Sequence, residues 1–176
     1  MKTFHELQEG VYDPNIFKAI FMAGGPGSGK SYVAKRTTSG LGLKMVNSDD
    51  IYEKMLNDAG LDTTPEDIYS DKGQEIRGRA KGVTSRMKGN FLDGRLGLII
   101  DGTGKDYDKI SNQSNELRQL GYDTHLIFVN TSLDVALERN AKRARSVPES
   151  VVIKSWKAVQ ANIGKFNNHF KQNLII

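Results

Sequence analysis

A chain of 176 residues has the length of one globular domain, and 38% hydrophobic with 26% charged residues is an ordinary soluble composition. It contains no cysteine, which excludes disulfides, zinc–thiolate sites and thiol catalysis. No apolar run approaches the roughly 20 residues that span a bilayer, and the first residues lack the apolar core of a secretion signal, so we expect a single cytoplasmic domain over residues 1–176 with no membrane partner.

Charge is unevenly distributed along a chain whose formal net charge is +4. Eight acids face one base from Asp49 to Asp71, whereas seven bases face two acids from Lys72 to Arg95. The segment from Arg139 to Lys157 carries six bases and one acid. Two basic segments in a weakly basic protein indicate a polyanion that is bound locally, with solvated helix faces as the alternative.

Apolar runs of strand length alternate along the chain with segments of helix length. This alternation predicts a three-layer α/β fold, in which a mostly parallel five-stranded sheet carries helices on both faces. The predicted strands are Phe17–Ala23, Lys44–Asn47, Leu96–Asp101, Thr124–Val129 and Asn173–Ile176, after an N-terminal extension over residues 1–16. The predicted helices are Lys30–Thr38, Asp50–Ala59, Lys72–Phe91, Tyr107–Leu120, Leu133–Lys142 and Glu149–Phe170.

The first predicted strand leads into a glycine-rich loop that matches the Walker A phosphate-binding pattern in full. Glycines let backbone N–H groups turn toward phosphate oxygens, and the following helix points the positive end of its dipole at them. We expect Lys30 to bridge the β- and γ-phosphates of ATP and Ser31 to ligate Mg²⁺. A glycine-rich turn without nucleotide is the alternative. The predicted nucleotide-binding residues are Gly24, Gly25, Pro26, Gly27, Ser28, Gly29, Lys30 and Ser31.

Two consecutive acids, Asp49 and Asp50, follow the second predicted strand. Ligands bind at the carboxyl ends of the strands in an open α/β sheet, and a carboxylate there is able to orient and deprotonate an attacking hydroxyl. One of the two is therefore predicted to be catalytic while the other caps the next helix, with double capping as the alternative. The acidic segment Asp58–Asp71, which contains Pro65, is predicted to be a mobile loop able to close over a substrate.

The predicted helix over 72–91 is rich in cations. Arg77, Lys81 and Lys88 recur at steps of four and seven, a spacing able to track a phosphate backbone. Arg79 and Arg86 lie on a different face, which weakens the interpretation as a single groove.

The third predicted strand delivers Asp101 to the Walker B position, where it would hold Mg²⁺ through the water shell of the ion. The alternative is an Asp that caps the helix near Asp106. A motor ATPase usually has a Glu immediately after this Asp, and Gly102 stands there instead. Asp101-x-x-Gly104 also matches a GTPase switch, but the sequence has no Asn-Lys-x-Asp element to select guanine. A kinase needs neither feature.

A cluster of basic residues predicts an arginine-rich lid over residues 139–148. Arg139 and Arg143 are four residues apart and are expected to share a helix face, and Pro148 ends that helix and starts another. Their fixed charges would offset the charge that develops on a transferred phosphoryl group.

The last predicted helix carries one apolar stripe at alternating steps of four and three. We therefore expect Trp156 to pack in the core rather than to serve as a base-stacking platform. The stripe consists of Val152, Trp156, Val159, Ile163, Phe166 and Phe170.

In their order and spacing these motifs resemble the P-loop phosphotransferase family that includes zeta toxins and the kinase domain of bacteriophage polynucleotide kinase, and they look closest to the latter. The resemblance covers roughly residues 17–165 and implies a P-loop kinase fold. The residues that carry it are Gly24–Ser31, Asn47–Asp50, Asp101–Gly104, Arg139–Arg143 and Val147-Pro148.

The resemblance implies a role for each motif. Asp49 takes the position of the general base and Arg143 acts on the phosphates, with Arg139 or Arg145 assisting. Lys30 and Ser31 hold ATP and Mg²⁺, and Asp101 falls on the acid after the third strand. Polynucleotide kinase has an acceptor-handling Arg three residues after its base, where this chain has Tyr52. Tyr52 is expected either to stack on a ring of the acceptor or to pack on the core.

We therefore expect an ATP- and Mg²⁺-dependent kinase that phosphorylates a hydroxyl of a nucleic acid or nucleotide, in the manner of a polynucleotide 5′-hydroxyl kinase. If the chain is phage-encoded, its compartment would be the host cytoplasm. One alternative is a kinase of hydroxymethylated DNA bases or of a nucleotide sugar, as in zeta toxins. A nucleotide-binding switch without phosphotransfer is the alternative from another class.

Overall fold

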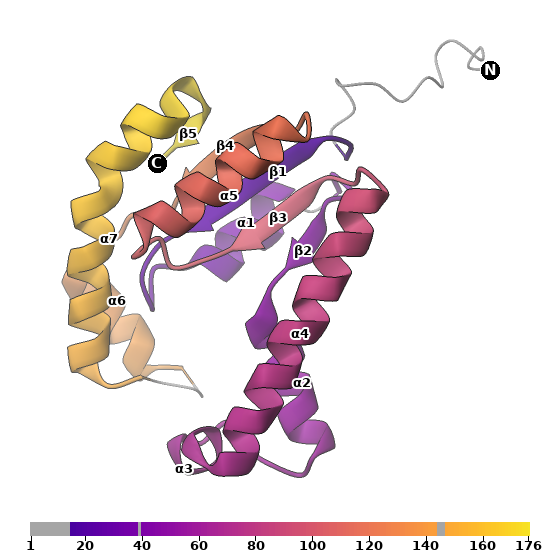
Figure 1. Cartoon of the computed structure of the whole chain (residues 1–176). Coiled ribbons are helices and arrows are strands. Elements are labelled where there is room, and N and C mark those ends of the chain that lie inside the picture. Colours follow the sequence, from indigo (N-terminus) through magenta and orange to yellow (C-terminus); the bar gives the residue numbers. More distant parts are fainter. Residues whose placement is uncertain (1–14, 39, 144–146) are drawn as a thin grey trace.

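Five parallel strands form the central sheet of the computed structural model, which describes residues 15–38, 40–143 and 147–176 (Figure 1). The strand order is β2-β3-β1-β4-β5, so β1 lies at the centre between β3 and β4. The predicted three-layer α/β fold is confirmed, and all four strand pairs are parallel. The strands are β1 (Lys18–Ala23), β2 (Lys44–Val46), β3 (Leu98–Asp101), β4 (Asp123–Phe128) and β5 (Leu174–Ile175).

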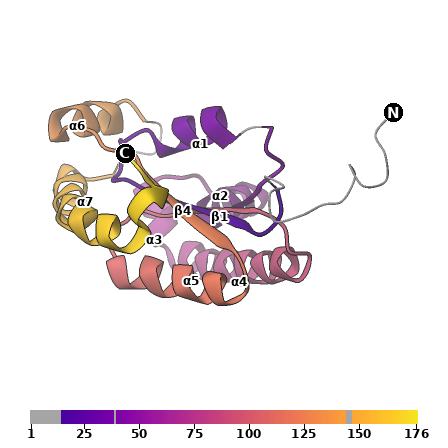
Figure 2. The same cartoon turned by 90° about the horizontal axis from the view of Figure 1, so that it is seen from above.

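Helices cover both faces of this sheet, as Figure 2 shows with α1 on one side and α4 and α5 on the other. Burial on both faces explains why β3 reads as a continuous apolar run. Each predicted helix is present, with ends that shift by at most a few residues. The helices are α1 (Lys30–Thr38), α2 (Ser48–Asp58), α3 (Pro65–Tyr69), α4 (Asp71–Asp93), α5 (Tyr107–Gln119), α6 (Leu133–Ala141) and α7 (Glu149–Phe170), with a 3₁₀ turn, η2 (Lys171–Asn173).

The main core lies between the sheet and the helices α5 and α7. Phe21 and Phe128 from the sheet pack there with Phe166 from α7, and each is about 1% exposed or less. Burying one such side chain contributes roughly 1.5–3 kcal/mol. Packed aromatic side chains of the core therefore support the strands that end at the site.

Helix α7 does not bury the predicted stripe in full. Trp156 and Ile163 are half-buried, whereas Ser155 and Asn162 are buried. The prediction that Trp156 belongs to the core is therefore wrong in part: its indole Nε1 donates a hydrogen bond to the Thr131 carbonyl at 2.8 Å. This hydrogen bond satisfies the indole N–H, which usually has a partner where a Trp side chain is buried in part.

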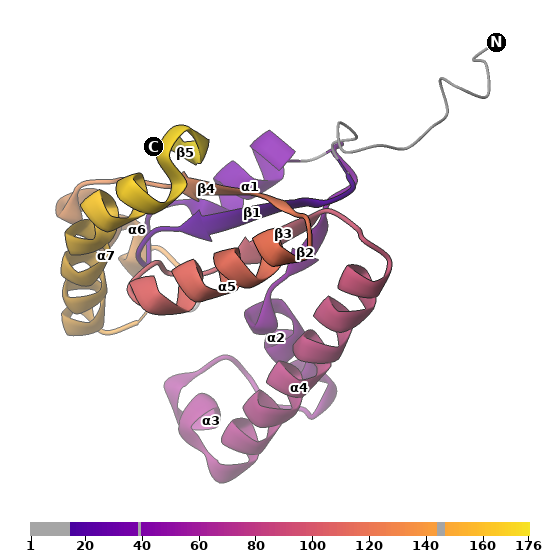
Figure 3. The ribbon, with the colours of Figure 1, turned by 45° about the horizontal axis from the view of Figure 1, so that its top comes forward.

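The helices α2, α3 and the first half of α4 form an arm that extends away from the sheet (Figure 3). The arm has its own apolar cluster around Tyr52 and Leu56, which are 1% and 0% exposed. The acidic segment predicted to be a loop contains α3, so that prediction is wrong. Thr64 caps α3 by accepting from the Asp67 N–H, and Pro65 occupies its first turn, where a missing N–H is harmless.

Tyr52 packs on the core of the arm, which was one of its two predicted roles. The Arg77 guanidinium lies 5.4 Å from the centre of its ring, so Arg77 does not continue a phosphate-tracking face with Lys81 and Lys88. Among the described residues, no helix combines the length and the apolar character that crossing a bilayer requires.

Candidate functional site

The glycine-rich loop joins β1 to α1 at the centre of the sheet, in the context that the Walker A pattern requires. Gly27 has a φ of +78°, and a Cβ atom there would lie 2.2 Å from the Ala136 carbonyl oxygen of α6. The loop therefore packs directly against α6, and only glycine fits this approach. The Lys30 ammonium donates to the Gly24 carbonyl at 2.7 Å and so folds back over the loop.

Lys30 is a half-buried cation. Burial lowers its pKa below 10.5, Asp101 acts in the opposite direction, Arg143 lowers the pKa further and Asp49 raises it. A cation whose charge is disfavoured by burial gains most from an anion brought beside it. This environment suits a phosphate group.

Asp101 stands at the carboxyl end of β3 and faces Lys30. Its Oδ2 accepts a 3.4 Å hydrogen bond from the Asn47 side chain, while its buried Oδ1 has no hydrogen-bond partner among the described residues. Burial raises the pKa of Asp101, Lys30 lowers it, and Asp49 and Asp50 raise it again. The alternative that Asp101 only caps a helix is wrong, because Asp106 caps α5 by accepting from the Lys109 N–H at 3.0 Å.

The residues at this position fit Mg²⁺. In the part of the chain that the structure describes, no group of three or more acidic or histidine side chains could hold a metal ion by itself. Mg²⁺ usually takes one or two protein ligands and completes its octahedron with water and substrate phosphates. The unpartnered Oδ1 of Asp101 and the nearby Ser31 hydroxyl would supply such a set, since both residues line the same cavity.

Helix α2 places the acidic pair at the second strand end. Its N-cap is Asn47, whose side-chain oxygen accepts from the Asp49 N–H at 2.9 Å. The prediction that an Asp caps this helix is therefore wrong, and both acids lie in its first turn. The Asp50 carboxylate accepts a hydrogen bond from the Asn47 amide at 3.1 Å. Burial raises the pKa of Asp50 most, and the charge of Asp49 raises it further. Asp49 is exposed to the cavity.

Two arginines reach the same cavity from the other side. The Arg139 guanidinium on α6 donates to the Ser28 carbonyl at 3.2 Å. Arg143 lies just after α6, because the helix ends at Ala141 and not at the predicted residue 142. The two therefore share a cavity but not a helix face. Residues 144–146, and with them Arg145 and the middle of the predicted lid, lie outside the described residues.

Asn140 belongs to the Arg139–Arg143 motif, but the sequence alone assigned it no role. It is 3% exposed, its amide donates to the Val147 carbonyl at 2.8 Å, and its oxygen accepts from the Val147 N–H at 3.1 Å. This reciprocal pair fixes the two ends of the connection between α6 and α7. Its place in the Arg139–Arg143 motif, shortly before Val147-Pro148, was the signal available in the sequence.

Most of the predicted site residues line one cavity of about 620 Å³. All the predicted site residues except Gly24 and Ser28 line it. Those two loop residues are buried. The cavity thus combines a loop able to bind phosphate, two arginines, and carboxylates from two neighbouring strand ends.

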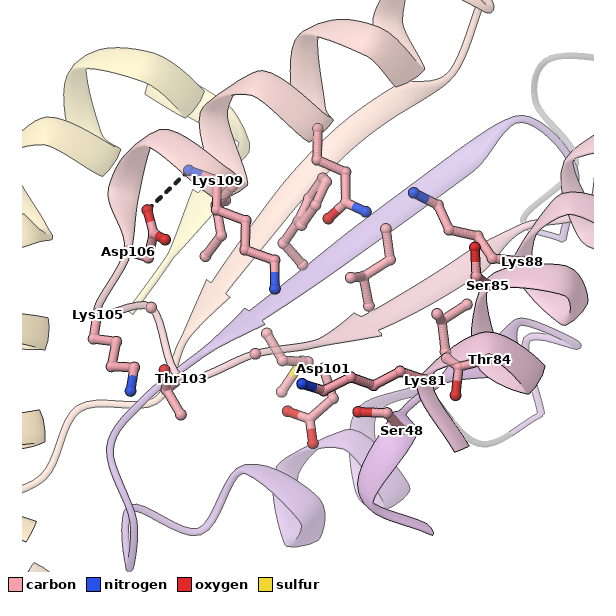
Figure 4. A pocket seen from close by; sticks show the side chains of 18 residues that line it. Ser48, Lys81, Thr84, Ser85, Lys88, Asp101, Thr103, Lys105, Asp106 and Lys109 are labelled. Carbon is pink, nitrogen blue, oxygen red and sulfur yellow. Dashed lines mark hydrogen bonds between the residues drawn. The ribbon is translucent and has the colours of Figure 1, made fainter. Parts of the chain in front are cut away.

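A second cavity of about 440 Å³ lies on the other side of Asp101, between α4 and α5 (Figure 4). Asp101 and Thr103 line both cavities. Lys81 and Lys88, singled out from the sequence, line the second cavity together with Lys109, which was not. The loop between β3 and α5 is held by the buried Asn162 amide, which donates to the Gly104 and Lys105 carbonyls at 3.0 Å.

Residues 20–165 match a family model described as an AAA domain. Among solved structures, the chain is similar to the complex of AvrRxo1-ORF1 and ORF2 with ATP, at 17% identity and a TM-score of 0.66, covering 87% of this chain and 50% of that one. It is also similar to a chain of the Pnkp1/Rnl/Hen1 RNA repair complex, at 19% identity and a TM-score of 0.66, covering 93% and 49%.

A third similar structure is a gluconokinase from Sinorhizobium meliloti 1021, at 16% identity and a TM-score of 0.51, covering 91% and 81%. The chain spans about half the length of the first two. At these identities the likenesses show the fold. No match was found among curated protein sequences.

Proposed function

We propose that this chain, which belongs to the AAA-domain family of P-loop proteins, is a kinase that transfers the γ-phosphoryl group of ATP to a hydroxyl of a nucleic acid or nucleotide. One observation carries the proposal: a single cavity contains the phosphate-binding loop, the carboxylate of Asp49 and the guanidinium groups of Arg139 and Arg143. The ATP in the AvrRxo1 complex and the gluconokinase among the similar structures support the donor and the reaction class.

In the proposed reaction Asp49 accepts the proton of the acceptor hydroxyl as its oxygen forms a bond to the γ-phosphorus. The bond between that phosphorus and the β–γ bridging oxygen breaks, and its electron pair leaves with ADP. Lys30 and Arg143 oppose the negative charge that spreads over the transferring group. Partial burial strengthens the effect of Lys30, because less solvent screens its charge.

A bound Mg²⁺ would supply further positive charge at the phosphates and orient them. The role of Ser31 is to present its hydroxyl at the start of α1, and that of Asp101 is to present an oxygen that no protein group occupies among the described residues. Asn47 positions both strand ends, because its oxygen holds the Asp49 N–H while its amide reaches Asp101. It is a positioning residue in this proposal.

The site argues against hydrolytic motors. Because Gly102 follows Asp101, this position has no side chain that could polarise a water molecule. The Gly102 N–H donates to the Met22 carbonyl at 3.1 Å. Hydroxymethylated DNA bases and nucleotide sugars remain acceptors of the proposed kinase class. A switch without phosphotransfer is the second candidate, and it is favoured only by the generic nature of the loop.

The proposal is tested by incubating the protein with γ-labelled ATP, Mg²⁺ and one acceptor at a time. The acceptors are 5′-hydroxyl DNA and RNA, hydroxymethyl-base DNA, nucleoside monophosphates and nucleotide sugars. We expect label to appear covalently on one acceptor, and Lys30→Ala to abolish this transfer. Release of all label as inorganic phosphate, or ATP binding without any turnover, would contradict the proposal.

A further inference from the structure

The second cavity has cations on two opposing walls. Lys81 and Lys88 come from α4 and Lys109 comes from α5, and Figure 4 shows all three side chains pointing toward the hollow. The floor is the carboxyl end of β3, where Asp101 sits at the boundary with the phosphate-loop cavity. A molecule in this cavity therefore has access to the proposed transfer site.

The wall formed by α4 is polar along one helical face. Lys81, Thr84, Ser85 and Lys88 are spaced i, i+3, i+4 and i+7, which places them on the same side of a helix, and all four line the cavity. Figure 4 shows both hydroxyls on the α4 wall beside the two lysine side chains. The two ammonium groups and the Ser85 hydroxyl offer donors to phosphate oxygens, whereas the Thr84 hydroxyl donates to the Ala80 carbonyl at 2.8 Å.

The charges of these lysines are not neutralised by a carboxylate in direct contact. Within the described residues, no ion pair joins Lys81, Lys88 or Lys109 to an acidic side chain. Burial lowers the pKa of Lys88, Glu116 on α5 raises it, and Lys109 lowers it again. The loss of solvation is the largest of these effects, and Lys109 acts on Lys88 less strongly than Glu116 does. An anion between Lys88 and Lys109 would offset both the loss of solvation and the remaining repulsion.

We propose that this lysine cavity binds the phosphate of the acceptor, so that the acceptor is a phosphate-bearing small molecule of nucleotide size. The inference rests on the proposed kinase function and narrows it. About 440 Å³ lies within the range of small-molecule sites. The cations needed to follow a polynucleotide further, Arg79 and Arg86, are exposed on α4 and do not line the cavity.

Binding is measured by calorimetry after the phosphate loop has been filled with Mg²⁺ and a non-hydrolysable ATP analogue. Each of the four common ribonucleoside 5′-monophosphates is then titrated and compared with the matching nucleoside. We expect at least one monophosphate to bind about tenfold or more tightly than its nucleoside, as a charge-assisted hydrogen bond requires. Lys88→Gln and Lys109→Gln should each remove most of that difference.

Lys157→Gln is the matched control, because Lys157 is an exposed lysine on α7 outside both cavities. It should leave monophosphate affinity unchanged, and all three variants should bind the ATP analogue as the wild type does. Lys109 is exposed and has a side chain without a structural role in the described contacts, so Lys109→Gln tests the inference even if Lys88→Gln proves unstable.

The inference is overturned if no monophosphate binds more tightly than its nucleoside, or if the lysine variants bind all of them normally. A 5′-hydroxyl oligonucleotide that binds more tightly than any monophosphate, and is weakened by Arg79→Gln rather than by Lys88→Gln, would also overturn it. Lysine-dependent binding without label transfer to any acceptor would support the cavity and contradict the kinase function, so the two failures are distinguishable.

Discussion

Replacing Gly27 with alanine tests whether the phosphate loop and α6 form one rigid unit. The new Cβ would lie 2.2 Å from the Ala136 carbonyl oxygen, whereas ordinary van der Waals contact begins near 3.4 Å. The backbone of α6 must therefore retreat, or the loop must move. Either shift separates Ser28 from Arg139, whose guanidinium donates to the Ser28 carbonyl at 3.2 Å.

The effect of Gly27→Ala has two parts. A left-handed φ of +78° in a residue with a Cβ costs roughly 1–2 kcal/mol, and overpacking against α6 costs about 1–3 kcal/mol more. We expect a melting temperature lower by about 4–20 °C for a chain of this size. Affinity for ATP should fall about tenfold or more, because the loop amides lose their alignment with the phosphates.

Melting is followed by circular dichroism and ATP binding by calorimetry, with Gly78→Ala as the control. Gly78 lies inside α4, and a Cβ atom added there would meet nothing within 4 Å, so alanine should stabilise the protein by about 0.5–1 kcal/mol and leave ATP binding unchanged. If Gly27→Ala melts and binds ATP like the wild type, the proposed rigid contact between the loop and α6 is refuted.

Two further variants test the same site. Asn140→Ala removes both hydrogen bonds to Val147, so it should lower stability by about 1–3 kcal/mol and weaken ATP binding through Arg143; unchanged melting would show that the connection does not depend on this pair. Asp101→Asn should abolish Mg²⁺-dependent ATP binding yet stabilise the metal-free protein at pH 7. The raised pKa of Asp101 means that folding disfavours the charged form of this side chain. This cost to stability is present above the raised pKa and absent below 3.8. In thermal unfolding, the extra stability of Asp101→Asn should therefore disappear as the pH is lowered toward 3.

The sequence was informative where local pattern and local chemistry coincide. The helices Lys30–Thr38 and Glu149–Phe170 have the predicted bounds, because a glycine-rich loop and a proline mark their beginnings. The segment around Pro65 was misinterpreted, although Thr64 before a proline and two acids is a helix-start signal. Its acidic composition suggested solvent exposure and hid the short helix.

The site was predictable in its phosphate loop and less so in its surroundings. Strand-end acids could be placed because carboxyl ends of parallel strands meet at one edge. The presence of Lys88 and Lys109 in one cavity could not be predicted, because it depends on how α4 and α5 flank β3. Arg77 had the right spacing for a phosphate face, but the aromatic ring of Tyr52 redirects it. Which group a side chain contacts in such cases is decided by tertiary packing, which the local sequence does not show.

The central claim, phosphoryl transfer with Asp49 as the base, is tested most directly by comparing Asp49→Asn with Asp50→Asn. For each variant, the rate of label transfer from γ-labelled ATP to the best acceptor is measured beside the affinity for ATP. We expect Asp49→Asn to bind ATP normally and to lose about 10²–10⁴-fold in transfer rate, while Asp50→Asn keeps most of its rate. Normal transfer by Asp49→Asn would contradict the assignment of the base, and the absence of transfer by the wild-type protein to every acceptor would contradict the kinase itself.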